Sequence, residues 1–412
     1  MADKLTTEDI NGLLETSDRY IHDETETFHR YLYDEIDWND RLISIKGARG
    51  VGKSTMMRQR IKEIFGEHSE RAVYVSLDDL WFSRYGLKPA IVYLYEHGFS
   101  HVFIDEVHRL GKNWSLEIKN ITDEFRKLNV VYSGSSLLQL ENSVGDLSRR
   151  QAPYELKGMS FREFLALEGK VKAPPLKLQD VLKNHRALAS ELSNQIEANG
   201  GRVLSLFEQY LKSGYYPFYR ESHARFGARL ESTINTVLNV DYPAIEDVSQ
   251  DTIRKCKRML MVLAASCPQT PNMSKLYSEL DSERNQGLKM LNALERAGLL
   301  ALVRSKGDSL KNLSKPEKIY CNNPNLMHAL TSAPDRGTMR ETFFYNQVVK
   351  NHAVEYTGVG DFVVDGEYTF EVGGKRKGFE QIADLSRSFV VNDDTEVGRG
   401  NKIPLWLFGF LY

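Results

Sequence analysis

Nine consecutive residues, GARGVGKST at 47–55, combine three glycines with a lysine, a serine and a threonine. Their spacing, G-x-x-x-x-G-K-S, is typical of a loop that binds phosphate, because glycines let backbone N–H groups turn towards the phosphate oxygens. Lys53 adds a full positive charge, and the Ser54 hydroxyl is suited to hold Mg²⁺. The residues predicted to bind nucleotide are Gly47, Ala48, Arg49, Gly50, Val51, Gly52, Lys53, Ser54 and Thr55.

Two carboxylates come directly after an apolar run in HVFIDEV, residues 101–107. Taken alone, an Asp-Glu pair in this place is more often a polar strand end. Beside a phosphate loop, Asp105 is suited to hold Mg²⁺ and Glu106 is suited to polarise an attacking water. We therefore expect the chain to bind ATP and Mg²⁺ and to hydrolyse ATP.

Further polar candidates follow or precede other strands. Ser133 ends the run VVYSGSS, where its hydroxyl could touch the γ-phosphate or the attacking water, although a serine that caps a helix explains it nearly as well. Arg149 and Arg150 precede the next strand. An arginine there could stabilise charge that develops on the γ-phosphoryl group, from its own subunit or a neighbour, while a solvated basic turn is an equal alternative.

The elements that must position these groups follow from the apolar pattern. The runs AVYVSL, HVFIDE, NVVYSGSS and APYELKG alternate with helical stretches such as SLEIKNITDEFRKL between residues 71 and 157, and RLISI precedes the phosphate loop. Strands that are apolar on both faces and alternate with helices indicate a parallel sheet with helices on each side. The predicted fold class of residues 1–170 is therefore α/β, with the phosphate loop at the carboxyl end of the first strand.

Length and composition limit the alternatives. A chain of 412 residues is long enough for two to three domains, and 54 basic against 56 acidic residues leave no charge excess that favours or excludes nucleic acid. Its three cysteines make no C-x-x-C pair, which argues against a disulfide framework and against a zinc site. We expect a cytoplasmic protein with no signal peptide and no membrane partner.

The middle of the chain, residues 171–330, is predicted to be helical after a proline-containing linker at 170–180. The aromatic cluster GYYPFY is more typical of a packed core than of a platform for bases. Two helices and two strands around the loop RSKGDSLKNLSKPE then suit a winged helix. Its candidates for contact with nucleic acid phosphates are Arg284, Lys289, Arg296, Lys306, Lys311 and Lys315. Winged helices also bind proteins, so both partner classes stay open.

The last region, residues 331–412, is predicted to open with the helix RGTMRETFFYNQVVKNH. Two short strands follow in GDFVVDGEYTFEVGGKRKG, and LWLFGFLY is expected to be a buried strand that closes the domain. Carboxylates from the helix and from the stretch with two short strands could converge on a metal ion, with a lysine nearby. These candidates are Glu341, Asp365, Glu371 and Lys375.

The motifs GARGVGKST, FIDEVH and YSGSS together resemble the AAA-type P-loop ATPases that carry a catalytic glutamate beside the second-motif aspartate. More narrowly, YELKGMSFREFLAL, YLKSGYYPFY and the C-terminal region resemble a bacterial and archaeal ATPase family. Its members combine an AAA core, a winged-helix-like region and a C-terminal domain of restriction-endonuclease-like, PD-(D/E)XK-type fold. The resemblance implies a phosphate contact for Lys53, Mg²⁺ contacts for Ser54 and Asp105, a water contact for Glu106, and a γ-phosphate sensor in Ser133. It does not distinguish Arg149 from Arg150 as the arginine finger.

The C-terminal region differs in one respect from the PD-(D/E)XK nucleases that it resembles. Those enzymes place a lysine two residues after the glutamate, whereas Gly373 stands there in this chain and Lys375 comes two residues later. We therefore expect this region to have the nuclease-like fold but to cleave little or no nucleic acid. The first function expected is an ATPase that acts on nucleic acid, the second a nucleotide-dependent switch for an unknown protein partner, and the third an ATP-regulated metal nuclease. A homo-oligomer is compatible with each.

Overall fold

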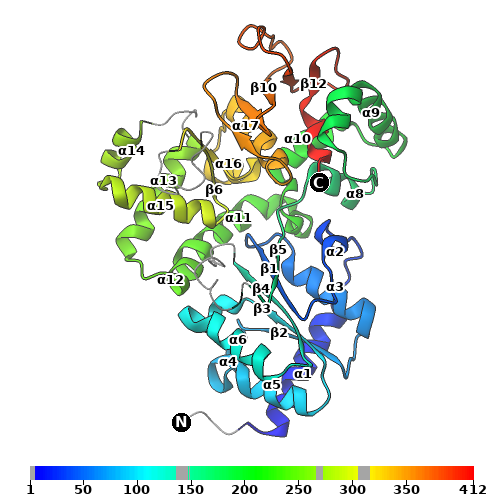
Figure 1. Cartoon of the computed structure of the whole chain (residues 1–412), viewed down its shortest axis with the longest axis vertical. Coiled ribbons are helices and arrows are strands. Elements are labelled where there is room, and N and C mark those ends of the chain that lie inside the picture. Colours follow the sequence, from blue (N-terminus) through cyan, green and yellow to red (C-terminus); the bar gives the residue numbers. More distant parts are fainter. Residues whose placement is uncertain (1–4, 136–146, 148, 266–271, 305–315) are drawn as a thin grey trace. The chain divides into compact units, whose positions relative to one another are not determined.

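A computed structural model describes residues 5–135, 147, 149–265, 272–304 and 316–412 (Figure 1). The chain forms two compact units. The first comprises Met1–Lys157 together with Asn239–Val248, and the second comprises Gly158–Leu238 and Ser249–Tyr412. The sequence predicts boundaries after residues 170 and 330, and nothing in it indicates that a short segment from the middle of the chain joins the first unit.

The first unit is built on a parallel sheet of five strands in the order β2-β3-β4-β1-β5. The strands are β1 (Leu42–Gly47), β2 (Ala72–Ser76), β3 (His101–Asp105), β4 (Asn129–Ser135) and β5 (Ala152–Glu155). Each of the five apolar runs identified in the sequence forms one strand. The α/β fold class with a parallel sheet is therefore confirmed for this unit.

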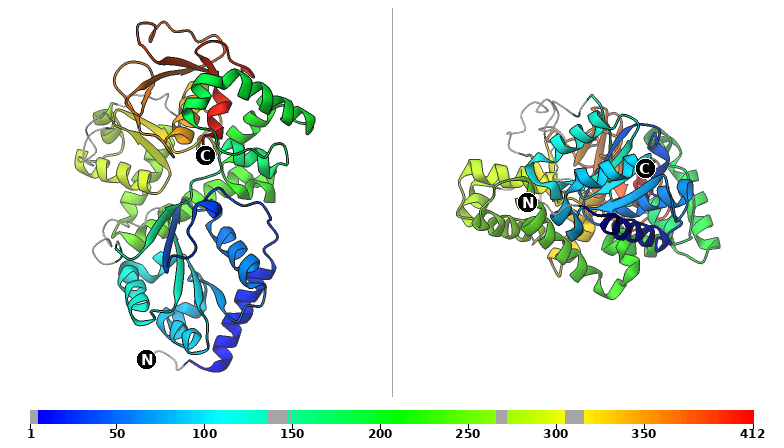
Figure 2. Two further views of the ribbon diagram at one scale, coloured as in Figure 1. Left: turned by 45° about the vertical axis from the view of Figure 1, so that its right-hand side comes forward. Right: turned by 90° about the horizontal axis from the view of Figure 1, so that it is seen from below.

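Helices cover both faces of this sheet (Figures 1 and 2). Alternate strand residues such as Val73, Val102 and Val130 share one buried cluster with Ile91 of α5 and Ile118 of α6, because successive side chains of a strand point to opposite faces. The helices and the 3-10 helix of the unit are α1 (Thr7–His22), α2 (Leu32–Glu35), α3 (Lys53–Phe65), α4 (Leu80–Tyr85), α5 (Leu87–Glu96), η1 (Val107–Asn113), α6 (Trp114–Glu124) and α12 (Tyr242–Ile245). Among them, α3 begins at Lys53, directly after the phosphate loop, as the sequence predicts.

The second unit is largely helical at its start. Its principal helices are α8 (Phe161–Leu167), α9 (Leu178–Ala198), α10 (Val203–Gln209), the π-helix η2 (Tyr210–Gly214), α11 (Phe226–Thr236), α13 (Gln250–Ala265), α14 (Met273–Glu279), α15 (Arg284–Arg296), α16 (Pro324–Leu330) and α17 (Arg336–Val348). Tyr215, Tyr216 and Tyr219 are buried, so the cluster GYYPFY is packed core, as expected. None of the helices in the described part of the chain combines the length and apolarity needed to cross a membrane.

The elements expected for a winged helix are present in the predicted order. The helices α14 and α15 are followed by β6 (Leu300–Val303) and β7 (Lys318–Cys321), which pair antiparallel. Arg284 and Lys289 are exposed on α15, and Arg296 is partly buried at its end. The other three basic candidates, Lys306, Lys311 and Lys315, lie outside the described residues, so the winged-helix assignment stays a prediction.

A second five-stranded sheet, in the order β12-β11-β10-β9-β8, occupies the C-terminal part. Its strands are β8 (Val354–Glu355), β9 (Phe362–Val364), β10 (Tyr368–Gly373), β11 (Ser388–Asn392) and β12 (Lys402–Pro404). The strand prediction for LWLFGFLY was wrong, because Leu405–Phe410 form the 3-10 helix η7 after Pro404. These residues are buried, as expected, and a short buried helix and a buried strand give the same continuous apolar run in a sequence.

Two glycines in helices of the second unit allow a matched test of its packing. A Cβ added at Gly287 of α15 would lie 2.2 Å from the buried ring of Tyr277, whereas nothing lies within 4 Å of a Cβ added at Gly227 of α11. We expect Gly287→Ala to destabilise the unit by about 1–3 kcal/mol through overpacking. Gly227→Ala should stabilise it by about 0.5–1 kcal/mol, because alanine loses less backbone entropy on folding. Urea denaturation measures both effects, and equal midpoints for the two variants would contradict this packing.

Candidate functional site

The phosphate loop has the backbone geometry that its glycines predict. Gly50 and Gly52 have φ angles of 85° and 100°, which residues other than glycine rarely adopt. Gly47 serves a different purpose, since a Cβ there would lie 2.5 Å from the carbonyl oxygen of Leu156. The loop therefore requires glycine twice for its turn and once for a close approach of two backbones.

The charge of the loop comes from Lys53, which is buried at the start of α3. Its Nζ donates to the carbonyl oxygens of Gly47 at 2.9 Å and Ala48 at 3.2 Å, so the ammonium group lies inside the loop. A second cation fixes the loop from outside: the buried guanidinium of Arg30 donates to the carbonyl oxygens of Val51 and Lys157. Nothing in the sequence around Arg30 indicates this role.

The two predicted acidic residues lie at the carboxyl end of β3, next to Ser133 of β4. The Ser133 hydroxyl donates to Asp105 Oδ1, and the backbone N–H of Glu106 donates to Ser133 Oγ at 3.2 Å and to Asp105 Oδ1 at 3.1 Å. Neighbouring parallel strands end at the same sheet edge, which explains why residues so far apart in the sequence meet here. The structure thus brings Asp105, Glu106 and Ser133 together.

The donor set predicted for a magnesium ion is the Ser54 hydroxyl and the Asp105 carboxylate. Tyr74 of β2 holds the second of these, because its hydroxyl donates to Asp105 Oδ2 at 2.5 Å. Burial and the negative charge of Asp105 raise the pKa of Tyr74 above its ordinary value, while hydrogen bonding with Ser54 acts in the opposite direction. The predicted ligands, Ser54 and Asp105, are hard oxygen donors, and they fit Mg²⁺.

Glu106 contacts a residue that the sequence does not single out. Its Oε2 lies 3.0 Å from Nδ1 of the fully buried His108, whose Nε2 lies 3.4 Å from Oδ1 of Asp241. Asp241 is also within 3.4 Å of an Arg49 guanidinium nitrogen in the phosphate loop. His108 belongs to the quoted motif FIDEVH and could have been noticed. Asp241 comes from the segment Asn239–Val248, and no local pattern connects it to the loop.

These ion pairs shift the titration of both partners. Burial alone would raise the pKa of Glu106, but His108, Lys53 and Arg49 lower it to about 2. Burial would likewise lower the pKa of His108, but Asp241 and Glu106 raise it to about 9. At neutral pH the site therefore holds a carboxylate next to an imidazolium.

The two arginine candidates lie elsewhere on the surface of this unit. Arg149 is exposed, and Arg150 is exposed and pairs with Asp123 of α6 at 3.1 Å. Neither position reveals which of the two would reach a phosphate. The assignment of an arginine finger therefore stays a prediction.

A second cluster of ionisable groups lies within the second unit. Glu341 of α17 is 3.3 Å from Lys318 Nζ of β7, which is also 3.1 Å from Asp361. Tyr320 donates to Glu341 Oε2 at 2.5 Å. Glu371 of β10 pairs with Lys377. Two predicted carboxylates, Glu341 and Glu371, therefore lie in this cluster.

The other two predicted members, Asp365 and Lys375, lie outside this cluster, so that part of the prediction was wrong. Asp365 lies in the turn between β9 and β10, where its carboxylate is bound by the His352 ring and the Ala353 N–H. Phe362 pairs with Phe370, so the residue opposite Glu371 is Asp361. Because a strand rises about 3.3 Å per residue, Asp365 lies at the far end of the hairpin.

The lysine that was expected near Glu371 comes from a different position. Strand β10 ends at Gly373, so Lys375 does not continue its face and is exposed. Lys377 reaches back to Glu371 instead. A Cβ at Gly373 would lie 2.7 Å from Cβ and Cγ of Lys377, so this glycine leaves room for the lysine chain.

The donor set of this cluster does not fit a metal ion. Burial, together with the charge of Asp361, raises the pKa of Glu341, and burial raises the pKa of Glu371, while the lysines oppose both shifts. The carboxylates that a metal would need are thus paired with the ammonium groups of Lys318 and Lys377. In the described residues, no three or more Asp, Glu, His or Cys side chains form a group that could hold a metal.

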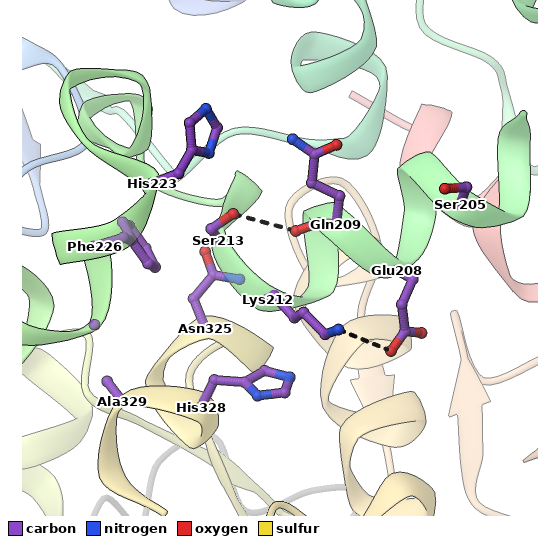
Figure 3. Close-up of a pocket in the computed structure, with 11 residues that line it drawn as sticks. Ser205, Glu208, Gln209, Lys212, Ser213, His223, Phe226, Asn325, His328 and Ala329 are labelled. Carbon is purple, nitrogen blue, oxygen red and sulfur yellow. Dashed lines mark hydrogen bonds and ion pairs between the residues drawn. The ribbon is translucent and has the colours of Figure 1, made fainter. Parts of the chain in front are cut away.

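A pocket of about 670 Å³ lies in the second unit between α10, η2, α11 and α16 (Figure 3). Asn325 fixes one wall: its amide donates to the carbonyl oxygens of Tyr210 and Leu211 and accepts from the N–H of Tyr215. The lining mixes charges, with Lys212 Nζ 4.0 Å from Glu208. None of the site residues predicted from the sequence lines this pocket.

Two lysines of the second unit, one inside and one outside the carboxylate cluster, allow a test of these corrections. Lys318→Ala would leave the buried Glu341 and the partly buried Asp361 without their cation and should destabilise the second unit by about 3–5 kcal/mol. The exposed Lys375→Ala should change stability by no more than about 0.5 kcal/mol. Denaturation in chelator and in Mn²⁺ measures both, and Mn²⁺ should restore part of the loss in Lys318→Ala alone. A stability loss in Lys375→Ala that equals that of Lys318→Ala would contradict the assignment.

Two parts of the chain match known sequence families. Residues 39–165 match an AAA domain, and residues 204–337 match a domain of unknown function, DUF8612. No curated protein matches the sequence. The first match contains the phosphate loop, Asp105, Glu106 and Ser133, whereas the second contains none of the residues predicted to bind nucleotide.

Solved structures with similarity to the chain include the Orc1 protein of Aeropyrum pernix in complex with DNA, with a TM-score of 0.31 and 13% identity over 80% of this chain and 93% of that one. PCH-2 of C. elegans has a TM-score of 0.24 and 19% identity over 48% of this chain and 59% of that one. Likenesses this distant carry no argument about function. The AAA match and the five-stranded parallel sheet give the first unit the P-loop AAA fold, which a helical region and a C-terminal α/β region follow.

Proposed function

We propose that this chain binds ATP together with Mg²⁺ and hydrolyses the terminal phosphoanhydride bond. One observation carries the proposal: the loop that holds Lys53 and Ser54 follows β1, and it lies at the same edge of the parallel sheet as Asp105 and Glu106 at the end of β3. A buried cation, oxygen donors for Mg²⁺ and a carboxylate for the water are the groups that phosphoryl transfer to water requires.

Each group has a separate task in this proposal. The N–H groups of the loop and Lys53 hold the phosphates. Ser54 and Asp105 hold Mg²⁺, which, when bound, neutralises negative charge on the phosphate oxygens. Glu106 orients the attacking water and accepts its hydrogen bond. Ser133 holds Asp105 in place through their hydrogen bond and accepts a hydrogen bond from the backbone of Glu106, which supports a role in positioning both acids. Its role as a γ-phosphate sensor stays a prediction.

Contact with nucleic acid is the second candidate function, and the exposed Arg284 and Lys289 on α15 favour it. Phosphate contacts by such side chains would make ATP turnover respond to DNA or RNA and would weaken steeply with salt. A nucleotide-dependent switch for a protein partner predicts no such response. The assay that separates them is ATP turnover with and without DNA or RNA at several salt concentrations. The metal nuclease has less support, because no three Asp, Glu, His or Cys side chains of the described residues form a group that could hold a metal.

Removal of the buried cation of the loop tests nucleotide binding. Lys53→Ala should weaken ATP binding by about tenfold or more and abolish turnover, because the loop then has no side-chain charge for the phosphates. Lys88→Ala, on the exposed surface of α5, is the matched control and should bind as the wild type does. Calorimetric titration with ATP measures the affinity. Unchanged affinity in folded Lys53→Ala would contradict the assignment of the loop.

Substitution of the two acids should separate binding from chemistry. Glu106→Gln keeps the size of the side chain but removes its charge, so we expect ATP affinity to persist while the rate falls by about a hundredfold or more. Asp105→Ala should instead abolish the dependence of ATP binding on Mg²⁺. Titration with and without Mg²⁺, together with steady-state turnover, measures both. Parallel loss of binding and turnover in Glu106→Gln would make Glu106 a structural residue.

A further inference from the structure

We propose that His108 and Asp241 are positioning residues for Glu106, and that the segment Asn239–Val248 thereby sets the rate of hydrolysis. This inference rests on the proposed function, since it assigns a task to two residues that do not themselves touch the reacting atoms. Neither residue belongs to the phosphate loop or to the predicted acidic pair. Both side chains are fully buried. Asp241 faces Arg49 of the phosphate loop, and His108 faces Glu106 of the acidic pair.

The protonation of His108 follows from what surrounds its ring. Nδ1 faces a carboxylate oxygen of Glu106 at 3.0 Å, and Nε2 faces a carboxylate oxygen of Asp241 at 3.4 Å. A neutral imidazole has only one N–H, so it would turn a lone pair towards one of the two negative charges. An imidazolium offers a donor to each. The ring therefore acts as a charged bridge with one carboxylate on either side.

The contact with His108 restrains the side chain of Glu106, which the hydrogen bonds of the Glu106 backbone do not hold. Glu106 has a φ angle of 59°, an uncommon conformation for a residue with a side chain, and its N–H is held by Asp105 and Ser133. Rotation of the side chain is the remaining freedom. The contact with His108 restrains that rotation and leaves Oε1 as the oxygen that can face a water. The rate of the reaction depends on such placement, because a shift of about 1 Å can cost about a hundredfold.

Asp241 connects this bridge to the phosphate loop and to the inserted segment. The same oxygen, Oδ1, lies 3.4 Å from both His108 and Arg49. The helix α12 follows Asp241 directly and packs against η1, the turn that carries His108. The segment is continuous at both ends with the second unit. A displacement of this segment would therefore move Asp241 away from His108 and release Glu106, without any change in the loop sequence.

The test compares kcat with binding in two conservative variants. His108→Gln and Asp241→Asn should each lower kcat for ATP hydrolysis by about tenfold to a hundredfold, while affinity for a non-hydrolysable ATP analogue stays within about threefold of the wild type. His101→Gln, at the opposite end of β3, is the matched histidine control and should change neither quantity. The decisive measurement adds His108→Gln to Glu106→Gln. A residue that acts through Glu106 has nothing left to position there, so kcat should not fall further.

Each other outcome has a definite meaning. Wild-type kcat in both His108→Gln and Asp241→Asn, or an additive loss in the double variant, would overturn the positioning role and leave the proposed function intact. Loss of analogue binding together with turnover would make His108 a purely structural residue and would also overturn it. A wild type that binds ATP without hydrolysing it would remove the proposed function first, and this inference with it.

Discussion

The carboxylate of Asp105 is buried at the edge of the first sheet and accepts hydrogen bonds from three groups. Tyr74 donates from β2, Ser133 donates from β4, and the backbone of Glu106 donates from the turn that follows β3. A buried charge is costly unless it is paired or hydrogen-bonded, so this one carboxylate ties three strand ends together. The position of Glu106 depends on that arrangement. The carboxylate proposed to hold a magnesium ion is thus also the one that connects these three strands through hydrogen bonds.

The residues of the candidate nucleotide site were predictable to the extent that their signals are local. The glycines, Lys53 and Ser54 form one continuous motif, and the strand before it and the helix after it have clear apolar periods. Asp105 and Ser133 could be placed because parallel strands end at a common edge. Asp241 could not be placed, because its connection to His108 spans a whole helical region and depends on tertiary contact alone. Arg30 was missed for the same reason.

The second unit shows how a small difference in register changes a prediction. The hairpin β9-β10 contains two aspartates, Asp361 and Asp365, and only the pairing of Phe362 with Phe370 decides which one faces Glu371. The glycine at position 373 likewise looked like a lost lysine in the sequence. In the structure it creates the space through which Lys377 reaches the same glutamate. Composition and spacing identified the right region here but selected two wrong members of the cluster.

The first unit consists of two separate stretches of the chain, and this determines the order in which its parts are synthesised. All five strands of the first sheet precede residue 158, but the ribosome must synthesise residues 158–238 before it reaches Asn239–Val248. Any part of the sheet that forms before residue 239 is synthesised therefore forms without Asp241. Until then His108 has one carboxylate neighbour, Glu106, instead of two. The candidate site gains Asp241 only after residues 158–238 have been synthesised.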